Sequence, residues 1–340
     1  MLKRLVRQLP DWRSPKALVL MYHRIAAPPV DVWDLAVTPA RFAEHLQVLR
    51  SSAKVLSTAE LLARVQTRTL EGHSVAITFD DGYEDNFTAA RPLLERVHLP
   101  ATFFVVANTL GQGQGFWWDE LEHILLLSPQ LPSFFSLMLG DGRTLAFDLR
   151  GEQVLSEKLL AQHGRWKALL DPPPTRRAAL YYQLWQSLKP LPYPQQQAAI
   201  INIKTWAGVP EYAGLTCPPM SRAQLTDLSS NPLFTVGAHT VTHPALACHS
   251  LARQHEELQT SKTMLEQALH KPVHLLAYPY GNYNDDTLPL VGSAGFSAAF
   301  TTQAQAVTQA ADPYRLGRCQ VNNWTGAALR RQLRRWFAYY

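Results

Sequence analysis

Two adjacent carboxylates at the end of an apolar run are the first residues whose types and position suit chemistry. Asp80 and Asp81 follow the apolar segment 74–79 and directly precede Gly82. Carboxylates beside a buried strand are costly unless they are paired, coordinate a metal or reach the surface. Successive strand side chains point to opposite faces, but Gly82 lets the chain turn at once, so both carboxylates could face one cavity. The alternative is that one of them only caps the next helix.

Two histidines four residues apart are the second candidate. If the segment coils for one turn, His239 and His243 lie on the same side, and Pro244 keeps them in a loop or single turn after a strand. Neutral imidazoles at this spacing are ordinary zinc ligands, although a chain with 12 histidines can show the spacing by chance. One Asp and two His would leave positions for water, which is the arrangement of catalytic rather than structural zinc.

A tight turn after a later apolar segment is the third candidate. In Tyr278-Pro-Tyr280-Gly281, proline and glycine fix a turn whose backbone N–H groups could point into a cavity. Aromatic-Pro-aromatic-Gly is also an ordinary structural turn, so this segment gains meaning only together with the other two.

The elements that must position these residues alternate between short apolar strands and amphipathic helices. This alternation is typical of βα units around a mainly parallel sheet, so we expect an α/β fold. Active sites of βα barrels collect at the C-terminal ends of the strands, where all three candidate segments fall. Strands are predicted at 17–22, 74–79, 101–106, 234–238, 274–278 and 296–300, and helices at 39–49, 59–65, 83–97 and 251–269.

The segment 111–216 interrupts this alternation and is rich in Leu, Gln and Trp. Helical periodicity at 118–128, 153–170 and 175–189 predicts a helical insertion packed on the barrel. The predicted division of the chain is 1–110 and 217–325 for the two parts of the barrel, 111–216 for the insertion, and 326–340 for a basic C-terminal helix.

Composition restricts the class of protein. The 340 residues are 46% hydrophobic and 17% charged, which is enough apolar material for a core and excludes wholesale disorder. No apolar run approaches the roughly 18 residues that cross a bilayer, and the basic start lacks the apolar stretch of a secretory signal. Three scattered cysteines fit a reducing compartment and form no metal motif. We therefore expect a cytoplasmic protein, free or at the inner membrane surface.

Taken in order, the candidate segments resemble the polysaccharide deacetylase family of metal-dependent carbohydrate esterases (NodB homology, carbohydrate esterase family 4). The resemblance covers about residues 15–107 and 216–320 and implies a distorted (β/α)7-type barrel with the insertion outside it. Its matching pieces are Thr78-Phe-Asp-Asp-Gly82, His239-Thr-Val-Thr-His-Pro244, Tyr278-Pro-Tyr-Gly281 and the leading Leu20-Met-Tyr-His23-Arg-Ile25.

The resemblance implies roles for the candidate residues. Asp80 would be the general base and Asp81, His239 and His243 the metal ligands, with the backbone N–H of Tyr280 stabilising an oxyanion. Zinc is the metal expected from these ligand types, with cobalt, nickel and manganese as alternatives. The implied activity is removal of N-acetyl groups from the amino sugars of a polysaccharide or glycan precursor. The alternatives are a non-catalytic glycan-binding relative and a metal-dependent sugar transferase.

Two departures from the family pattern affect the site. The arginine that holds the base in many members is replaced by Ala277, so Arg318 or Arg315 would have to supply that charge. The late Leu-x-His motif that carries the general acid is also missing, and His23 is its natural replacement, unless it is only a buried histidine under a loop. Some relatives carry these motifs in circularly permuted order, and this chain is expected to be one of them.

The partners expected from the sequence follow from these features. The substrate would be an N-acetylated glycan, and Trp117 and Trp118 would either anchor the insertion in the core or line the glycan groove. The C-terminal segment 329–337 is a basic amphipathic helix that could rest on anionic lipid with the basic residues near Met1, or be merely solvated. Nucleic-acid binding is not expected, because the basic residues accompany no recognition element.

Overall fold

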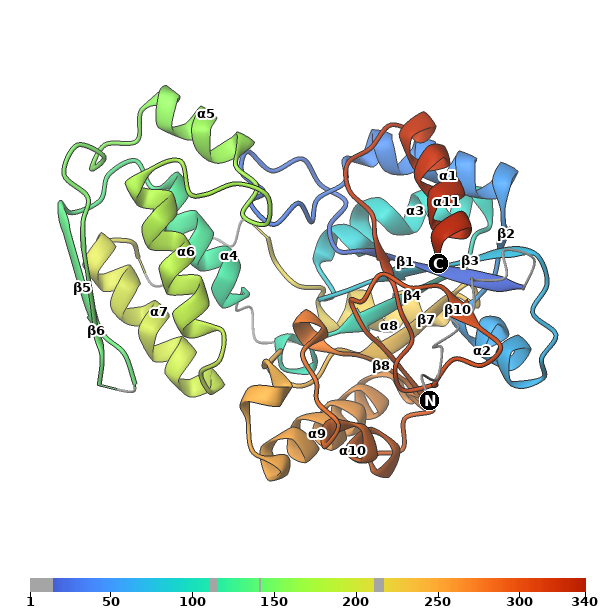
Figure 1. Cartoon of the computed structure of the whole chain (residues 1–340). Helices are drawn as coiled ribbons and strands as arrows, with labels where there is room; N and C mark the ends of the chain where they lie inside the picture. Colours follow the sequence, from blue (N-terminus) through green and yellow to red (C-terminus); the bar gives the residue numbers. More distant parts are fainter. Residues whose placement is uncertain (1–14, 111–114, 141, 211–216) are drawn as a thin grey trace, which may run out of the picture.

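The computed structural model describes residues 15–110, 115–140, 142–210 and 217–340, so the basic segment near Met1 lies outside the described residues. Figure 1 shows two parts side by side, a curled sheet with its helices and a largely helical part formed by the middle of the chain. No helix within the described ranges combines the length and the apolar character that crossing a bilayer requires.

The main sheet consists of short buried strands. Its order is β10-β1-β3-β4-β7-β8-β9, and all neighbours are parallel except β10, which is antiparallel to β1. Parallel strands covered on both faces are mostly apolar, and β1 is buried over its whole length and apolar from Ala17 to Tyr22. The strands are β1 (Lys16–Tyr22), β2 (Lys54–Val55), β3 (His73–Phe79), β4 (Ala101–Val105), β7 (Phe234–Ala238), β8 (Leu275–Ala277), β9 (Ala298–Phe300) and β10 (Val307–Thr308).

A late segment of the chain brings the two edges of this sheet together. Leu316 bridges to Phe300 of β9, and β11 (Cys319–Gln320) then pairs in parallel with β1. The sheet therefore curls towards closure, which confirms the predicted α/β fold with a distorted barrel. The closing segment was not predicted as a strand, because two residues of pairing leave no periodic pattern.

Capping residues explain where several of the surrounding helices begin. Thr38 caps α1 with Pro39 at its first position, and Ser57 forms a capping box with Glu60 at the start of α2. In Figure 1, α11 lies beside α1 at one side of the sheet. The helices are α1 (Pro39–Ser52), α2 (Thr58–Gln66), α3 (Arg91–Val97), α8 (Arg222–Ser230), α9 (Leu251–Leu269), α10 (Thr287–Ser293) and α11 (Gly326–Tyr339).

The insertion packs around a second hydrophobic core, to which Val30, Val32, Tyr83 and Val106 of the barrel also contribute. It contains a β-hairpin besides its helices, so it is not purely helical as predicted. The hairpin β5–β6 was missed because its exposed face carries apolar Phe134 and Met138, so polar and apolar residues do not alternate. Helix α7 was not predicted, and its Pro194 lies in the first turn, where proline is tolerated. The elements are α4 (Trp117–Glu122), β5 (Phe134–Met138), β6 (Thr144–Asp148), α5 (Glu157–Arg165), α6 (Arg176–Leu188) and α7 (Tyr193–Ala207).

Candidate metal centre and active site

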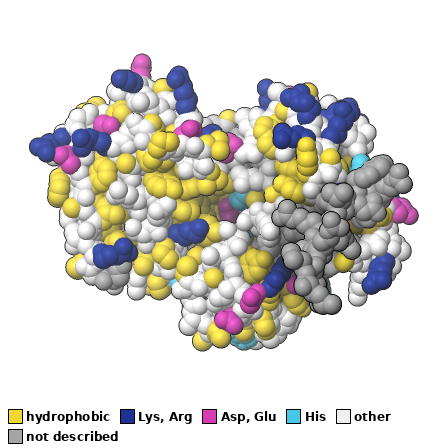
Figure 2. Space-filling model, in the orientation of Figure 1, with side chains coloured by type: hydrophobic (Ala, Val, Ile, Leu, Met, Phe, Trp, Pro, Cys, Tyr) yellow, Lys and Arg dark blue, Asp and Glu magenta, His cyan; other side chains and the backbone are white. Residues whose placement is uncertain are grey.

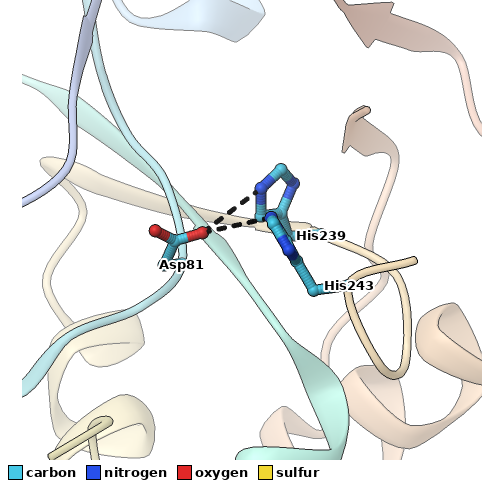
Figure 3. Close-up of side chains that lie close together, drawn as sticks. All are labelled: Asp81, His239 and His243. Atoms are coloured by element: carbon cyan, nitrogen blue, oxygen red, sulfur yellow. Dashed lines mark ion pairs between the residues drawn. The ribbon is translucent and has the colours of Figure 1, made fainter. Parts of the chain in front are cut away.

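Three side chains from two strand ends converge on one point (Figure 3). The Nε2 atoms of His239 and His243 lie 3.5 and 3.4 Å from the same Oδ1 atom of Asp81. One possible ligand atom from each residue lies within 4.8 Å of the other two, and all three residues are buried. Asp81 follows β3 and both histidines follow β7, so the ends of two strands separated by β4 form this cluster.

The loops that carry the cluster are held in unusual backbone conformations. Asp81, Thr240 and His243 have φ values of +70°, +65° and +57°, which cost roughly 1–3 kcal/mol each in residues other than glycine. Gly82 has a φ of +81°, and a Cβ there would lie 3.0 Å from the Val105 side chain, so only glycine fits easily. Strain of this kind persists only where surrounding contacts fix the loop.

Buried Glu257 on α9 supplies such contacts to the histidine loop. Its carboxylate accepts hydrogen bonds from the backbone N–H groups of Val241 and Thr242 at 2.8 and 2.9 Å. It also accepts a bond from the Thr242 hydroxyl at 2.6 Å, and Arg253 balances its charge. Sequence reasoning missed Glu257. Its one signal is an acid on the buried face of the predicted helix 251–269.

The protonation of the cluster tests whether a metal fits. The His239 Nδ1 atom lies 2.8 Å from the Ala277 carbonyl oxygen, which can only accept, so Nδ1 carries the proton and Nε2 turns a lone pair towards Asp81. Burial lowers the pKa of His243 to about 3, so this imidazole is neutral as well. A lone pair from His239, the Nε2 atom of a second neutral imidazole and a carboxylate facing one point fit a divalent cation.

Asp80 is held apart from this cluster by Arg318. Two parallel bonds of 2.6 and 2.7 Å join the guanidinium to the carboxylate, and Arg318 is fully buried. Its Nε–H donates to the Thr301 carbonyl at 2.9 Å, which fixes the plane of the guanidinium. Burial alone would raise the pKa of Asp80, but Arg318 reverses this effect and lowers it, so the carboxylate stays ionised and able to accept a proton.

The geometry decides between the two arginines considered from the sequence. Arg318 lies on the segment that closes the sheet between β9 and β1, which brings its side chain to the end of β3. Arg315 instead pairs with exposed Asp285 at the surface and does not reach Asp80.

His23 directly follows β1 and lies near Asp80. Its Nε2 atom is 4.0 Å from Asp80 Oδ2, which is beyond hydrogen-bond distance, and the side chain is 14% exposed. The Asn86 side chain donates to the His23 carbonyl at 2.7 Å and so fixes the backbone there. This placement is compatible with a proton donor in the same cavity, and the role itself stays a prediction.

Aromatic rings pack against the outer side of His243. The rings of Tyr280 and Trp118 have centres 4.4 and 4.6 Å from the imidazole. Trp118 is 7% exposed and donates a hydrogen bond to the Tyr83 hydroxyl, so it anchors the insertion and lines the site at once. Tyr280 has a φ of +56°, and its hydroxyl is buried without a partner among the described residues.

A cavity of about 240 Å³ opens above these residues. Its volume lies below the usual range of ligand pockets, so it suits a substituent of a large molecule rather than the whole of it. Figure 2 shows a hollow between the two parts of the protein, with acidic and histidine side chains at its base and hydrophobic side chains on the insertion's side. The barrel contributes Met21, His23, Asp80, Asp81, His239, His243, Tyr280, Thr302 and Gln320.

The other wall of the cavity was not predicted from the sequence. Trp33, on the loop after β1, donates a hydrogen bond of 2.7 Å to the Tyr181 hydroxyl and packs its ring 4.2 Å from that of Trp185. Leu169 and Lys189 complete this wall. These residues meet only because α6 folds back towards the barrel, and no local pattern in the sequence records that contact.

Comparisons with known proteins agree with this geometry. The sequence profile described as polysaccharide deacetylase matches residues 67–126 and 193–299, and so includes Asp80, Asp81 and both histidines but neither His23 nor Arg318. Poly-β-1,6-N-acetyl-D-glucosamine N-deacetylases are similar to the chain. The Staphylococcus aureus (strain N315) enzyme is 29% identical to this chain, and the match covers 97% of this chain and 86% of that enzyme. The Staphylococcus epidermidis enzyme is 22% identical, and the match covers 92% of this chain and 81% of that enzyme.

Solved structures share the fold. A Streptococcus pyogenes deacetylase in complex with acetate has a TM-score of 0.59 at 18% identity and covers 94% of this chain and 99% of its own. IcaB from Ammonifex degensii has a TM-score of 0.59 at 18% identity, and the match covers 96% of this chain and 98% of IcaB. These matches extend over most of the insertion, whereas the resemblance seen from motifs stopped at the barrel.

Proposed function

Because this chain belongs to the polysaccharide deacetylase family, we propose that it hydrolyses the N-acetyl groups of amino sugars in a poly-N-acetylglucosamine-like glycan. The observation that carries the proposal is the Asp81–His239–His243 cluster beside a separately held Asp80–Arg318 pair. Three protein ligands suit a catalytic site, and a second, ionised carboxylate next to them suits a base. The glycan is taken from the names of the relatives, which act on poly-β-1,6-N-acetylglucosamine.

A divalent ion held by Asp81, His239 and His243 would supply a Lewis acid that activates water and polarises the acetyl carbonyl. Residues of this chain carry out the proton transfers and stabilise the oxyanion. Asp80 takes the proton from the attacking water, and Arg318 keeps its carboxylate charged and oriented. His23 donates a proton to the departing amine, and the backbone N–H of Tyr280 stabilises the oxyanion. Zinc fits these ligand types, with cobalt, nickel and manganese as alternatives.

Elemental analysis combined with acetate release tests this proposal. We expect about one divalent ion per chain, and we expect acetate release from β-1,6-linked N-acetylglucosamine oligomers or chitin oligomers. Removal of the ion with a chelator should stop acetate release, and re-addition of zinc should restore it. Bound metal without acetate release from any N-acetylated oligomer would favour the non-catalytic glycan-binding alternative. Tight binding of a nucleotide sugar would instead favour the transferase.

We also infer that an arginine-rich face contacts an anionic membrane surface. This arginine face consists of residues on α1, α3 and α11 around a groove of about 880 Å³, and Figure 2 shows Lys and Arg side chains gathered over this part of the protein. The large apolar residues Leu329, Leu333, Trp336 and Phe337 of α11 are buried, so this part of the helix offers its charges rather than an insertion surface. This contact is our basis for placing the protein at a membrane. The arginines are Arg50, Arg96, Arg330, Arg331 and Arg334.

Vesicle sedimentation measures this contact. The protein should sediment with phosphatidylglycerol vesicles and not with phosphatidylcholine vesicles, and 0.5 M salt should release it. Because each arginine near an anionic surface contributes about 1 kcal/mol, the variant with Arg330→Gln and Arg334→Gln should bind about 10- to 30-fold more weakly. The matched control changes exposed Arg165 and Arg222 to Gln, away from the arginine face. Equal weakening by both variants would contradict a localised contact.

A further inference from the structure

Lys189 places a positive charge at the rim of the active-site cavity. It directly follows α6 of the insertion, and its Nζ atom lies 4.4 Å from the centre of the Tyr280 ring and 4.9 Å from that of Trp185. The Tyr280 ring in turn lies 4.4 Å from the ring of His243. One aromatic ring therefore separates the ammonium group from a residue of the metal cluster.

No carboxylate in the described part of the chain lies within ion-pair distance of Lys189. This distinguishes it from Lys167 and Lys204, which form ion pairs of 2.9 Å with Asp34 and Glu120. Burial lowers the pKa of Lys189, which shows that its ammonium has lost part of its hydration. Contacts with two aromatic faces replace that hydration only in part. Such an ammonium gains more from an anionic ligand than a fully solvated lysine does.

The proposed reaction changes charge at the place that Lys189 faces. Hydrolysis of a neutral acetamido group by water yields acetate and an amine, and the amine on the sugar is protonated near neutral pH. A glycan that has been deacetylated once therefore carries an ammonium group beside the next target. When that sugar occupies the cavity rim, two positive charges face each other.

We propose that Lys189 selects substrates by charge, favouring a glycan with an acidic group on a sugar next to the target N-acetyl group and disfavouring one with a free amine there. This inference rests on the proposed deacetylase function. Applied to a poly-N-acetylglucosamine chain, it means that amines accumulate at separated positions rather than in runs. Applied to other glycans, it predicts preference for an anionic substituent, whether carboxylate or phosphate.

Matched tetrasaccharides test the inference. All carry one N-acetylglucosamine as target, and its neighbours are glucose, glucosamine, glucuronic acid or a sugar phosphate. For partly buried charges about 8 Å apart and an effective dielectric constant of about 20, we expect up to roughly a 30-fold change in kcat/KM for each unit of charge at low ionic strength. The acidic glycans should be hydrolysed fastest and the amine-bearing one slowest. Comparison of the glucuronic acid and phosphate arms then shows which anionic group the site prefers.

Variants assign the ranking to Lys189. Lys189→Met keeps most of the side-chain packing and should bring the kcat/KM values of the four glycans to within about twofold, and Lys189→Glu should reverse their order. The control Lys158→Met changes an exposed lysine of α5 and should keep the wild-type ranking. Equal hydrolysis of all four glycans by the wild-type enzyme would overturn the charge selection but leave the deacetylase function intact. Absence of acetate from every glycan would overturn both.

Discussion

Asp80→Asn is expected to retain about one divalent ion per chain and to lower the turnover of acetate release about 1,000-fold. Asn has nearly the same shape as Asp but cannot accept a proton, and general bases typically contribute 10²- to 10⁴-fold. Asp80 is not part of the metal cluster, because Arg318 occupies both of its oxygens. Metal content by elemental analysis and kcat on N-acetylglucosamine oligomers measure the two effects. A variant with undiminished turnover would remove Asp80 as the base.

A control pair separates loss of the base from loss of the metal. His239→Ala removes one of the three buried ligand atoms and should release the ion together with activity, in contrast to Asp80→Asn. His274→Ala alters an exposed histidine just before β8 and should keep both metal and activity. If Asp80→Asn also lost its ion, its low activity would say nothing about proton transfer, and the base assignment would need a different test.

The central strands and the first parts of the site could be predicted because their signals are local. The run 74–79 is mostly apolar and ends at Asp80-Asp81-Gly82, so strand, carboxylates and turn are adjacent in the sequence. The helix expected at 251–269 has the bounds of α9, since Ser250 caps it and His270 ends it in a left-handed conformation. Residues that neighbour one another along the chain carry their own structural signal.

The rest of the site depends on contacts between distant segments. Sequence alone left Arg315 and Arg318 as alternatives, because the choice depends on how residues 316–320 return to β1. The role of Glu257 in holding the histidine loop could not be predicted for a similar reason. A buried acid and a surface acid on a helix have the same sequence signal. Lys189 lies 50 residues from His239, the nearest strand-end motif, and the packing of α6 brings it to the cavity.

Arg318→Met is expected to destabilise the protein by about 3–5 kcal/mol, because it leaves the Asp80 carboxylate buried without its partner. Adding Asp80→Asn to this variant removes the uncompensated charge and should recover a large part of the lost stability. Activity should stay low in the double variant, since the base is absent. Denaturant unfolding of the wild type, both single variants and the double variant measures the coupling free energy.

Arg315→Met is the matched control for this cycle. Arg315 pairs with Asp285, whose side chain is 93% exposed, and exposed ion pairs contribute about 0–1 kcal/mol. The two arginines lie only three positions apart in the chain. A large difference in stability between their variants would therefore result from the burial and the partner of Arg318, and not from its place in the chain. If Arg318→Met unfolded at the same denaturant concentration as Arg315→Met, the buried pair would not be what holds Asp80. The closing segment of the sheet would then have to position the base by its backbone alone.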